Sequence, residues 1–123
     1  MLYNTDAQTI AAGGTLTLPA NSINSTGSIT ASGTTGVTLA PGQYLVTFVS
    51  DANVAAAGTL GAALELGGAP YAVTAETQDA AGADRITLTA IVTPTTAQPL
   101  TVINSSGSSN TYTNSTLTIV KLA

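Results

Sequence analysis

The sequence contains no cysteine, no histidine and no tryptophan. Without cysteine there are no disulfides, no thiolate nucleophiles and no metal sites built on sulfur ligands. Without histidine the chain lacks the side chain that most often acts as a general acid or base near neutral pH. Any chemistry would therefore have to come from carboxylates, hydroxyl groups or the few cations.

Charge is scarce as well. Charged residues make up 7% of the chain, whereas an average soluble domain carries about 25%. The only cations are Arg85 and Lys121, and the net charge is −4, so no basic patch is available to neutralise nucleic-acid phosphates. The surface must consist mainly of Ser, Thr, Asn, Gly and Ala, and such a surface suits burial against another molecule.

Long apolar runs are missing even though 44% of the residues are hydrophobic and the mean hydropathy is +0.35. Ser, Thr or Gly interrupts every run before it approaches the roughly 18 residues that a membrane-spanning helix needs. The first six residues also lack the basic start and apolar stretch of a secretory signal. The length of 123 residues corresponds to one domain. We therefore expect a single domain over residues 1–123 that does not insert into a membrane.

Alternation with a period of two residues recurs throughout the chain, separated by Gly, Pro, Asn and Ser, and helical periodicity is absent. This pattern predicts an all-β sandwich, either a jelly roll or an immunoglobulin-type sandwich; against the latter stands the missing Trp and Cys pair. The predicted strands are Gln8–Ala11, Thr15–Leu18, Ser28–Thr30, Gly36–Leu39, Gln43–Ser50, Thr59–Leu66, Tyr71–Ala75, Arg85–Val92, Leu100–Asn104 and Ser115–Leu122.

Two of these strands, Gln43–Ser50 and Ser115–Leu122, carry apolar residues on both faces. Strands of this kind are buried between layers. We predict that one face supplies the core of the subunit and the other a contact to further subunits. The candidates for these core and interface positions are Tyr44, Phe48, Leu117 and Ile119.

The carboxylates closest to one another in sequence are Glu76, Asp79 and Asp84, in a stretch predicted to be a loop. They allow either a calcium site or a solvated turn, and their spacing matches no defined calcium loop. Lys121 lies between apolar residues near the chain end, where a solubilising charge is the simpler interpretation than a catalytic base. We predict no catalytic residue, no metal and no cofactor. An enzyme with an unrecognised carboxylate site is the alternative.

Aromatic residues are rare, at 4% of the chain, which leaves almost no stacking platform for sugars or bases. Tyr44 and Phe48 are expected inside the domain. Tyr112 is set in a predicted polar loop, where either core packing or an exposed contact with a ligand is possible.

Four segments in order resemble the C-terminal domain of bacterial collagen-like spore-surface (exosporium) glycoproteins. They are Pro41–Val46, the hairpin Leu64–Pro70, the strand end Ile91–Val92 and the closing stretch Asn114–Leu122. The resemblance extends from about Thr9 to Ala123. Each segment alone has the residues of an ordinary turn or strand. The resemblance is specific only because all four segments occur in this order.

The resemblance implies a jelly roll of the tumour-necrosis-factor and complement-head type that forms a homotrimer at the tip of a collagen-like stalk. It also implies the absence of catalytic residues, a role in trimer assembly and surface display, and a location on the spore exosporium. The Gly-X-Y repeats of such a stalk are absent from this chain. The alternative is the receptor- or glycan-binding head of an adhesin or of a phage or virion decoration protein, with Tyr112 as its candidate ligand contact.

Overall fold

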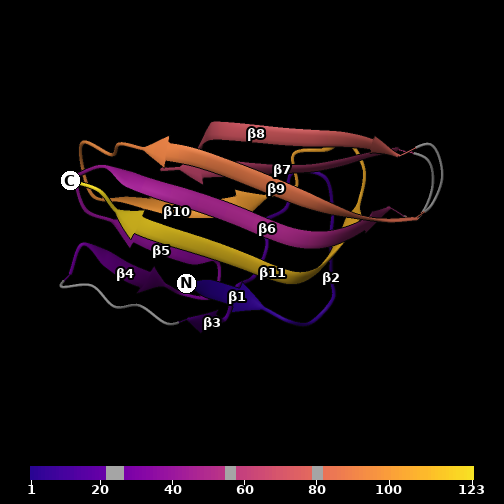
Figure 1. The fold of residues 1–123 in the computed structure, drawn as a ribbon, viewed down its shortest axis with the longest axis horizontal. Helices are drawn as coiled ribbons and strands as arrows, with labels where there is room; N and C mark the ends of the chain where they lie inside the picture. Colours follow the sequence, from indigo (N-terminus) through magenta and orange to yellow (C-terminus); the bar gives the residue numbers. More distant parts are fainter. Residues whose placement is uncertain (22–26, 55–57, 79–81) are drawn as a thin grey trace.

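The computed structural model describes residues 1–21, 27–54, 58–78 and 82–123 (Figure 1). In these residues the regular secondary structure consists of β-strands arranged in two sheets. The prediction of an all-β sandwich is therefore confirmed. Within the same residues there is no helix with the length and apolar character that crossing a bilayer requires.

One sheet has six strands and runs in the order β3-β1-β11-β6-β9, with β2 pairing with β11 as well. All of its pairings are antiparallel, and β11 and β6 form its centre. Its strands are β1 (Leu2–Asn4), β2 (Gln8–Ile10), β3 (Ala20–Asn21), β6 (Tyr44–Val54), β9 (Gly82–Val92) and β11 (Asn110–Lys121).

The other sheet has five strands in the order β4-β5-β10-β7-β8, and it is also antiparallel. A tight turn at Gly67 and Gly68, both with positive φ, joins β7 to β8. Its strands are β4 (Ile29–Ser32), β5 (Gly36–Leu39), β7 (Gly58–Leu66), β8 (Ala69–Gln78) and β10 (Gln98–Ile103).

The pairing of the eight main strands is nested. The outermost pair in sequence is β1 with β11, followed inward by β5 with β10, β6 with β9, and β7 with β8. Successive nested pairs are distributed between the two sheets. This is the connectivity of a jelly roll, so the fold class is the jelly-roll alternative.

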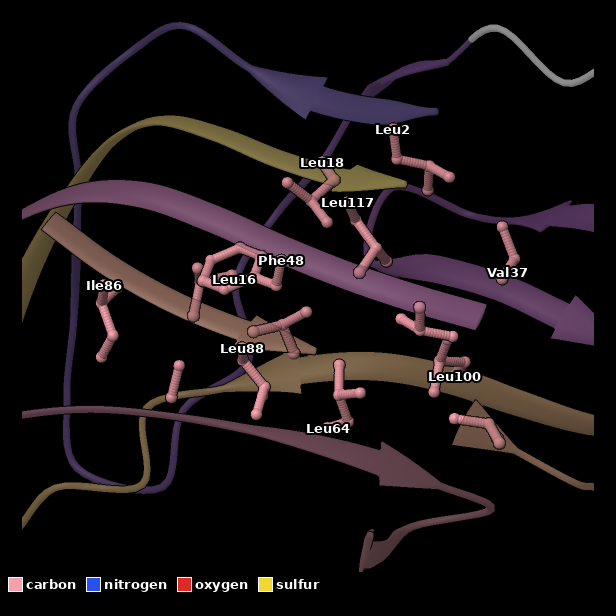
Figure 2. Close-up of a cluster of buried hydrophobic side chains, with 14 of the residues drawn as sticks. Leu2, Leu16, Leu18, Val37, Phe48, Leu64, Ile86, Leu88, Leu100 and Leu117 are labelled. Carbon is pink, nitrogen blue, oxygen red and sulfur yellow. The ribbon is translucent and has the colours of Figure 1, made fainter. Parts of the chain in front are cut away.

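The core lies between the two sheets, and its side chains come from alternate positions of the long strands (Figure 2). Phe48 and Leu117 from the six-stranded sheet face Leu64 and Leu100 from the five-stranded one, and all four are fully buried. Each such side chain contributes about 1.5–3 kcal/mol relative to an exposed one. This apolar layer stabilises a chain that has no disulfide.

The segment Thr15–Leu18 differs from the prediction of a strand. Thr15 forms only an isolated bridge with Ile103. Leu16 N donates to Val102 O at 2.9 Å, whereas Leu18 N donates to Thr34 O at 2.6 Å, so the segment changes partner from one residue to the next. The alternation of buried and exposed side chains is nevertheless as predicted, because Leu16 and Leu18 are buried in the core.

Strand β11 begins earlier than predicted, at Asn110, and contains a bulge. Its register against β6 shifts between Thr113 and Thr116, and Asn114 adopts a positive φ of 53°. The extra residue reverses the alternation, so Tyr112 before the bulge and Leu117 after it both point into the core. A single period of two cannot describe this strand.

The predicted loop from Glu76 to Asp84 is largely strand in the described residues. Strand β8 continues to Gln78 and β9 starts at Gly82, and the two lie in different sheets. The short strands β1 and β3 were not predicted. They contain three and two residues, too few for alternation to be recognised.

Candidate functional site

The outward side of the six-stranded sheet is the most distinctive surface of the domain. Along β6 the even-numbered residues from Tyr44 to Phe48 are buried, while Leu45, Thr47 and Val49 point outward and are partly exposed. The neighbouring strands β9 and β11 alternate in the same way. Three adjacent strands therefore present one continuous set of outward side chains.

The register groups these outward side chains into three rows across β11, β6 and β9. We call these nine residues the outer face. All of them are Thr, Val, Leu or Ile, so none is ionisable, and Ile91 and Val120 are 47% and 49% exposed. The rows are Val120–Leu45–Ile91, Thr118–Thr47–Thr89 and Thr116–Val49–Thr87.

A fourth row, beyond Thr116–Val49–Thr87, is charged. Asp51 pairs in register with Arg85 on one side and Thr113 on the other. Arg85 Nε and Nη2 both donate to Asp51 Oδ1 at 3.3 Å, and Asn114 Nδ2 donates to Asp51 Oδ2 at 3.4 Å. We call Asp51, Arg85, Thr113 and Asn114 the ion row. The Arg85 and Asp51 side chains are 68% and 46% exposed, and an ion pair so open to solvent contributes about 0–1 kcal/mol.

The apolar end of the outer face continues around the β9 edge of the sheet. Tyr71, at the start of β8, is 42% exposed, and its hydroxyl lies 3.4 Å from Thr93 Oγ1, just beyond the end of β9. The opposite edge of the sheet carries polar contacts, with Asn4 and Gln8 donating to Thr17 O, together with the exposed side chains of Met1 and Tyr3. We call the β9 edge with Tyr71 the apolar margin.

A buried polar cluster lies where the connection between β10 and β11 meets the sandwich. Asn104 Nδ2 donates to Ile10 O and Ser108 O at 2.9 and 2.8 Å, and Asn104 Oδ1 accepts from Ser106 N and Oγ. Asn110 Oδ1 accepts hydrogen bonds from Ser106 Oγ and Tyr112 Oη, both at 3.1 Å. Among the described residues no buried side-chain polar atom lacks a partner. The cluster therefore holds the connection against the sandwich.

The structure places the predicted core and interface residues on the inner side of the sheet. Tyr44, Phe48 and Leu117 are fully buried, and Ile119 is partly buried against the core. These four side chains fill the subunit interior. The outward positions that alternate with them are the ones available to another molecule.

Tyr112, the candidate ligand contact, is not in a polar loop. It lies in β11, is fully buried, and donates its hydroxyl hydrogen to Gly61 O as well as to Asn110. Burial raises the pKa of the Tyr112 hydroxyl well above its usual range. Of the two roles that the sequence left open, the structure shows core packing.

The acidic stretch offers no assembled site in the part of the chain that is described. Asp84 is exposed on β9, and its Oδ1 accepts from Arg85 N at 2.8 Å. The side chain of Glu76 and all of Asp79 lie outside the described residues. The described residues contain no group of three or more His, Cys, Asp or Glu side chains arranged to hold a metal ion. Lys121 is exposed and donates to Ser28 Oγ at 3.0 Å.

Comparison with known proteins gives neither a matching family model nor a matching curated protein. Among solved structures the chain is similar to the CBM36-1 domain of a multidomain xylanase from the hindgut metagenome of Trinervitermes trinervoides, with 11% identity, a TM-score of 0.46, and coverage of 96% of this chain and 99% of that one. It is also similar to the carbohydrate-binding module CBM36 in complex with calcium and xylotriose, with 18% identity, a TM-score of 0.43, and coverage of 92% and 99%.

Proposed function

We propose that this domain is a non-catalytic head that assembles into a homotrimer through the outer face of its six-stranded sheet. The observation that carries the proposal is the outer face itself, where nine adjacent residues on three strands include no charge. Four of the nine are aliphatic and five are threonines, and an uncharged exposed surface of this kind marks a place that another molecule covers. The low overall charge of the chain fits the same interpretation.

The outer face is large enough to form the centre of a protein contact. It spans five positions on each of its three strands, from Leu45 to Val49 on β6. At about 3.4 Å per residue and about 4.8 Å between strands, it covers about 17 Å by about 14 Å, or about 240 Å² in projection. One partner contributes roughly 800 Å² to a standard interface. The outer face therefore supplies the centre of one contact, and the surface around it, including Tyr71, supplies the rest.

A second copy of the same chain is the partner that we favour. A cyclic trimer forms when one surface of each copy packs against a different surface of the next and the ring closes. The outer face and the apolar margin of the β9 edge provide two such surfaces. The likeness of four segments to the head of collagen-like spore-surface proteins supports three as the number of copies.

In this proposal the head works by holding three chains together in a fixed arrangement. A stable trimer holds three chains together at high local concentration, which favours the nucleation of a weak triple-helical stalk, and it displays any attached segment threefold. We place it on the outside of a bacterial cell or spore, in line with the same resemblance. Catalysis has no part in this function.

The glycan-binding head is the second candidate. The CBM36 module of known structure was solved with calcium and xylotriose, and that pair of ligands supplies a direct probe. In the described residues the exposed aromatic side chains are Tyr3 and Tyr71, which belong to different sheets. Calorimetric titration with xylotriose, with and without calcium, tests this candidate, and saturable binding by a monomeric domain would favour it over the trimeric head.

Light scattering coupled to gel filtration tests the trimer. At micromolar concentration we expect a mass three times that of the 12.1 kDa chain. The variant Thr47→Lys places a charge in the middle of the outer face and should give a folded monomer, because a lone charge is costly to bury. The control Thr30→Lys, on the exposed edge strand β4, should remain trimeric. A monomeric wild-type protein overturns the proposal, and a trimeric Thr47→Lys variant overturns the role of the outer face.

A further inference from the structure

The outer face and the ion row together form a gradient of polarity along the strands. At one end lies the aliphatic row Val120–Leu45–Ile91, followed by a row of three threonines. At the other end lies the ion row around Asp51. Leu45 and Asp51 are six residues apart on β6, which corresponds to about 20 Å along the strand. Burial from water is therefore favourable at the aliphatic end of the surface and unfavourable at the charged end.

Two directions of packing are conceivable for copies that meet on this surface. In an antiparallel arrangement the ion row of one copy would lie against the aliphatic end of the next copy's β9 edge, near Ile91. Asp51 and Arg85 would then lose water without gaining a polar partner, which is unfavourable for both charges. In a parallel arrangement each end of the outer face meets the same end of the neighbouring copy's β9 edge, so that Asp51 of one copy and Arg85 of the next lie at one level.

We propose that the ion row sets the direction of assembly, so that copies of this chain pack only in parallel. The inference rests on the proposed function and names Asp51 and Arg85 as its specificity-determining residues. Their side chains are about half exposed or more, so the guanidinium group of one copy is accessible to the carboxylate of another. The attraction between opposite charges of neighbouring copies favours parallel packing. The contact of charged groups with aliphatic ones disfavours antiparallel packing.

The internal contacts of the ion row keep the charges at the surface. Arg85 and Asn114 both donate to the Asp51 carboxylate, and Asn114 reaches it because of the positive φ at the bulge. An exposed pair of this kind stabilises the single subunit little. Its effect is expected in the choice of partner orientation and not in the stability of the fold.

Parallel packing also determines where the N-termini of the copies lie relative to one another. Leu2 pairs with Leu117, next to the threonine row of the outer face, and β1 lies at the side of β11 (Figure 1). In a parallel assembly Met1 of every copy therefore lies at the same level along the strands. Three segments attached ahead of Met1 would leave the head from one level and in register.

The experiment compares wild type with the double variant Asp51→Asn/Arg85→Gln, which removes the charges and keeps similar side-chain sizes. Because the chain has no cysteine, a single spin label can be attached through Asn53→Cys, beyond the ion row, or through Thr93→Cys, near the aliphatic row. Pulsed electron resonance then gives distances between copies. In the wild type each label should give one short distance, as parallel packing requires.

The double variant should add a distance that is longer by about 20 Å or more for both labels, since the strand ends would then be far apart, and light scattering should show species other than trimers. The control variant Glu65→Gln/Lys121→Gln also removes one acid and one base, but off the outer face, and should behave as wild type. Unchanged distances and mass in the Asp51/Arg85 variant overturn this inference alone. A monomeric wild type overturns the proposed function and this inference with it.

Discussion

The hydroxyl group of Tyr112 in β11 donates a hydrogen bond to the carbonyl oxygen of Gly61 in β7, 51 residues earlier in the chain. The two strands belong to different sheets, so the bond joins the layers of the sandwich. Tyr112 also donates to Asn110 Oδ1, which in turn accepts from Gly61 N at 3.2 Å. One tyrosine thereby anchors the end of the domain at which β10 and β11 are connected.

Removing this hydroxyl should weaken the fold without changing it. Tyr112→Phe keeps the ring in the core and deletes the donor, leaving the acceptors of Gly61 and Asn110 with fewer partners in a buried site. We expect the free energy of unfolding to fall by about 1–3 kcal/mol. Urea unfolding at neutral pH measures the change. An unaltered midpoint would show that the hydroxyl contributes nothing to the joining of the sheets.

Alkaline pH should destabilise the domain through the same residue. The pKa of Tyr112 is raised in the folded state, and an unfolded tyrosine ionises at a pH of about 10. The stabilisation is therefore fully present below that pH and decreases above it, by up to about 1.4 kcal/mol for each pH unit. Urea unfolding over a series of alkaline pH values measures this slope. Tyr112→Phe should have a shallower slope, and equal slopes would contradict the assignment.

Gly61 should tolerate no side chain. A Cβ at this position would lie 2.7 Å from Ser105 Oγ and 2.9 Å from the backbone nitrogen of Ser106. Gly61→Ala is expected to lower the free energy of unfolding by about 1–3 kcal/mol, since the connection after β10 must shift. The matched control is Gly107→Ala in the same connection, where nothing lies within 4 Å. Thermal unfolding of both variants tests the difference, and equal melting temperatures would contradict it.

The long strands could be predicted because their alternation is unbroken. From Tyr44 to Ala52 on β6 and from Ile86 to Val92 on β9 every second residue points into the core, and the predicted strands Gln43–Ser50 and Arg85–Val92 lie within these strands except for Gln43. The all-β class and the two-faced apolar character of β6 follow from the same pattern. The sequence favoured the jelly roll over the immunoglobulin-type sandwich, but the order of the strands could not be predicted, because alternation carries no information about which strands pair.

The position of Tyr112 could not be predicted, because the bulge at Asn114 reverses the alternation. Before it the buried positions are even-numbered, and after it they are odd-numbered. Period-two analysis therefore recognises only Ser115–Leu122 and leaves Tyr112 in a loop. An asparagine between two Thr-rich stretches is a weak signal of a positive φ.

Only part of the outer face could be predicted from the sequence. Alternation shows that Gln43–Ser50 has two apolar faces, but it does not show which face is buried in the subunit, so Tyr44 and Phe48 were candidates for the core or for the interface. The structure places both in the core. The three rows depend on the register among β11, β6 and β9. Register is a property of the folded sheet, since strands 30 or more residues apart carry no mutual signal in a single sequence.

The pairing of Leu2 with Leu117 has a consequence for biosynthesis. A ribosome releases the partner of the first strand only after almost the whole chain has been made, and three of the four nested pairs join strands well separated in sequence. Such non-local contacts slow folding and leave strand edges open meanwhile. We expect nascent chains lacking β11 to remain without a closed core, so that the β7–β8 hairpin is the one main-strand pair that can form early.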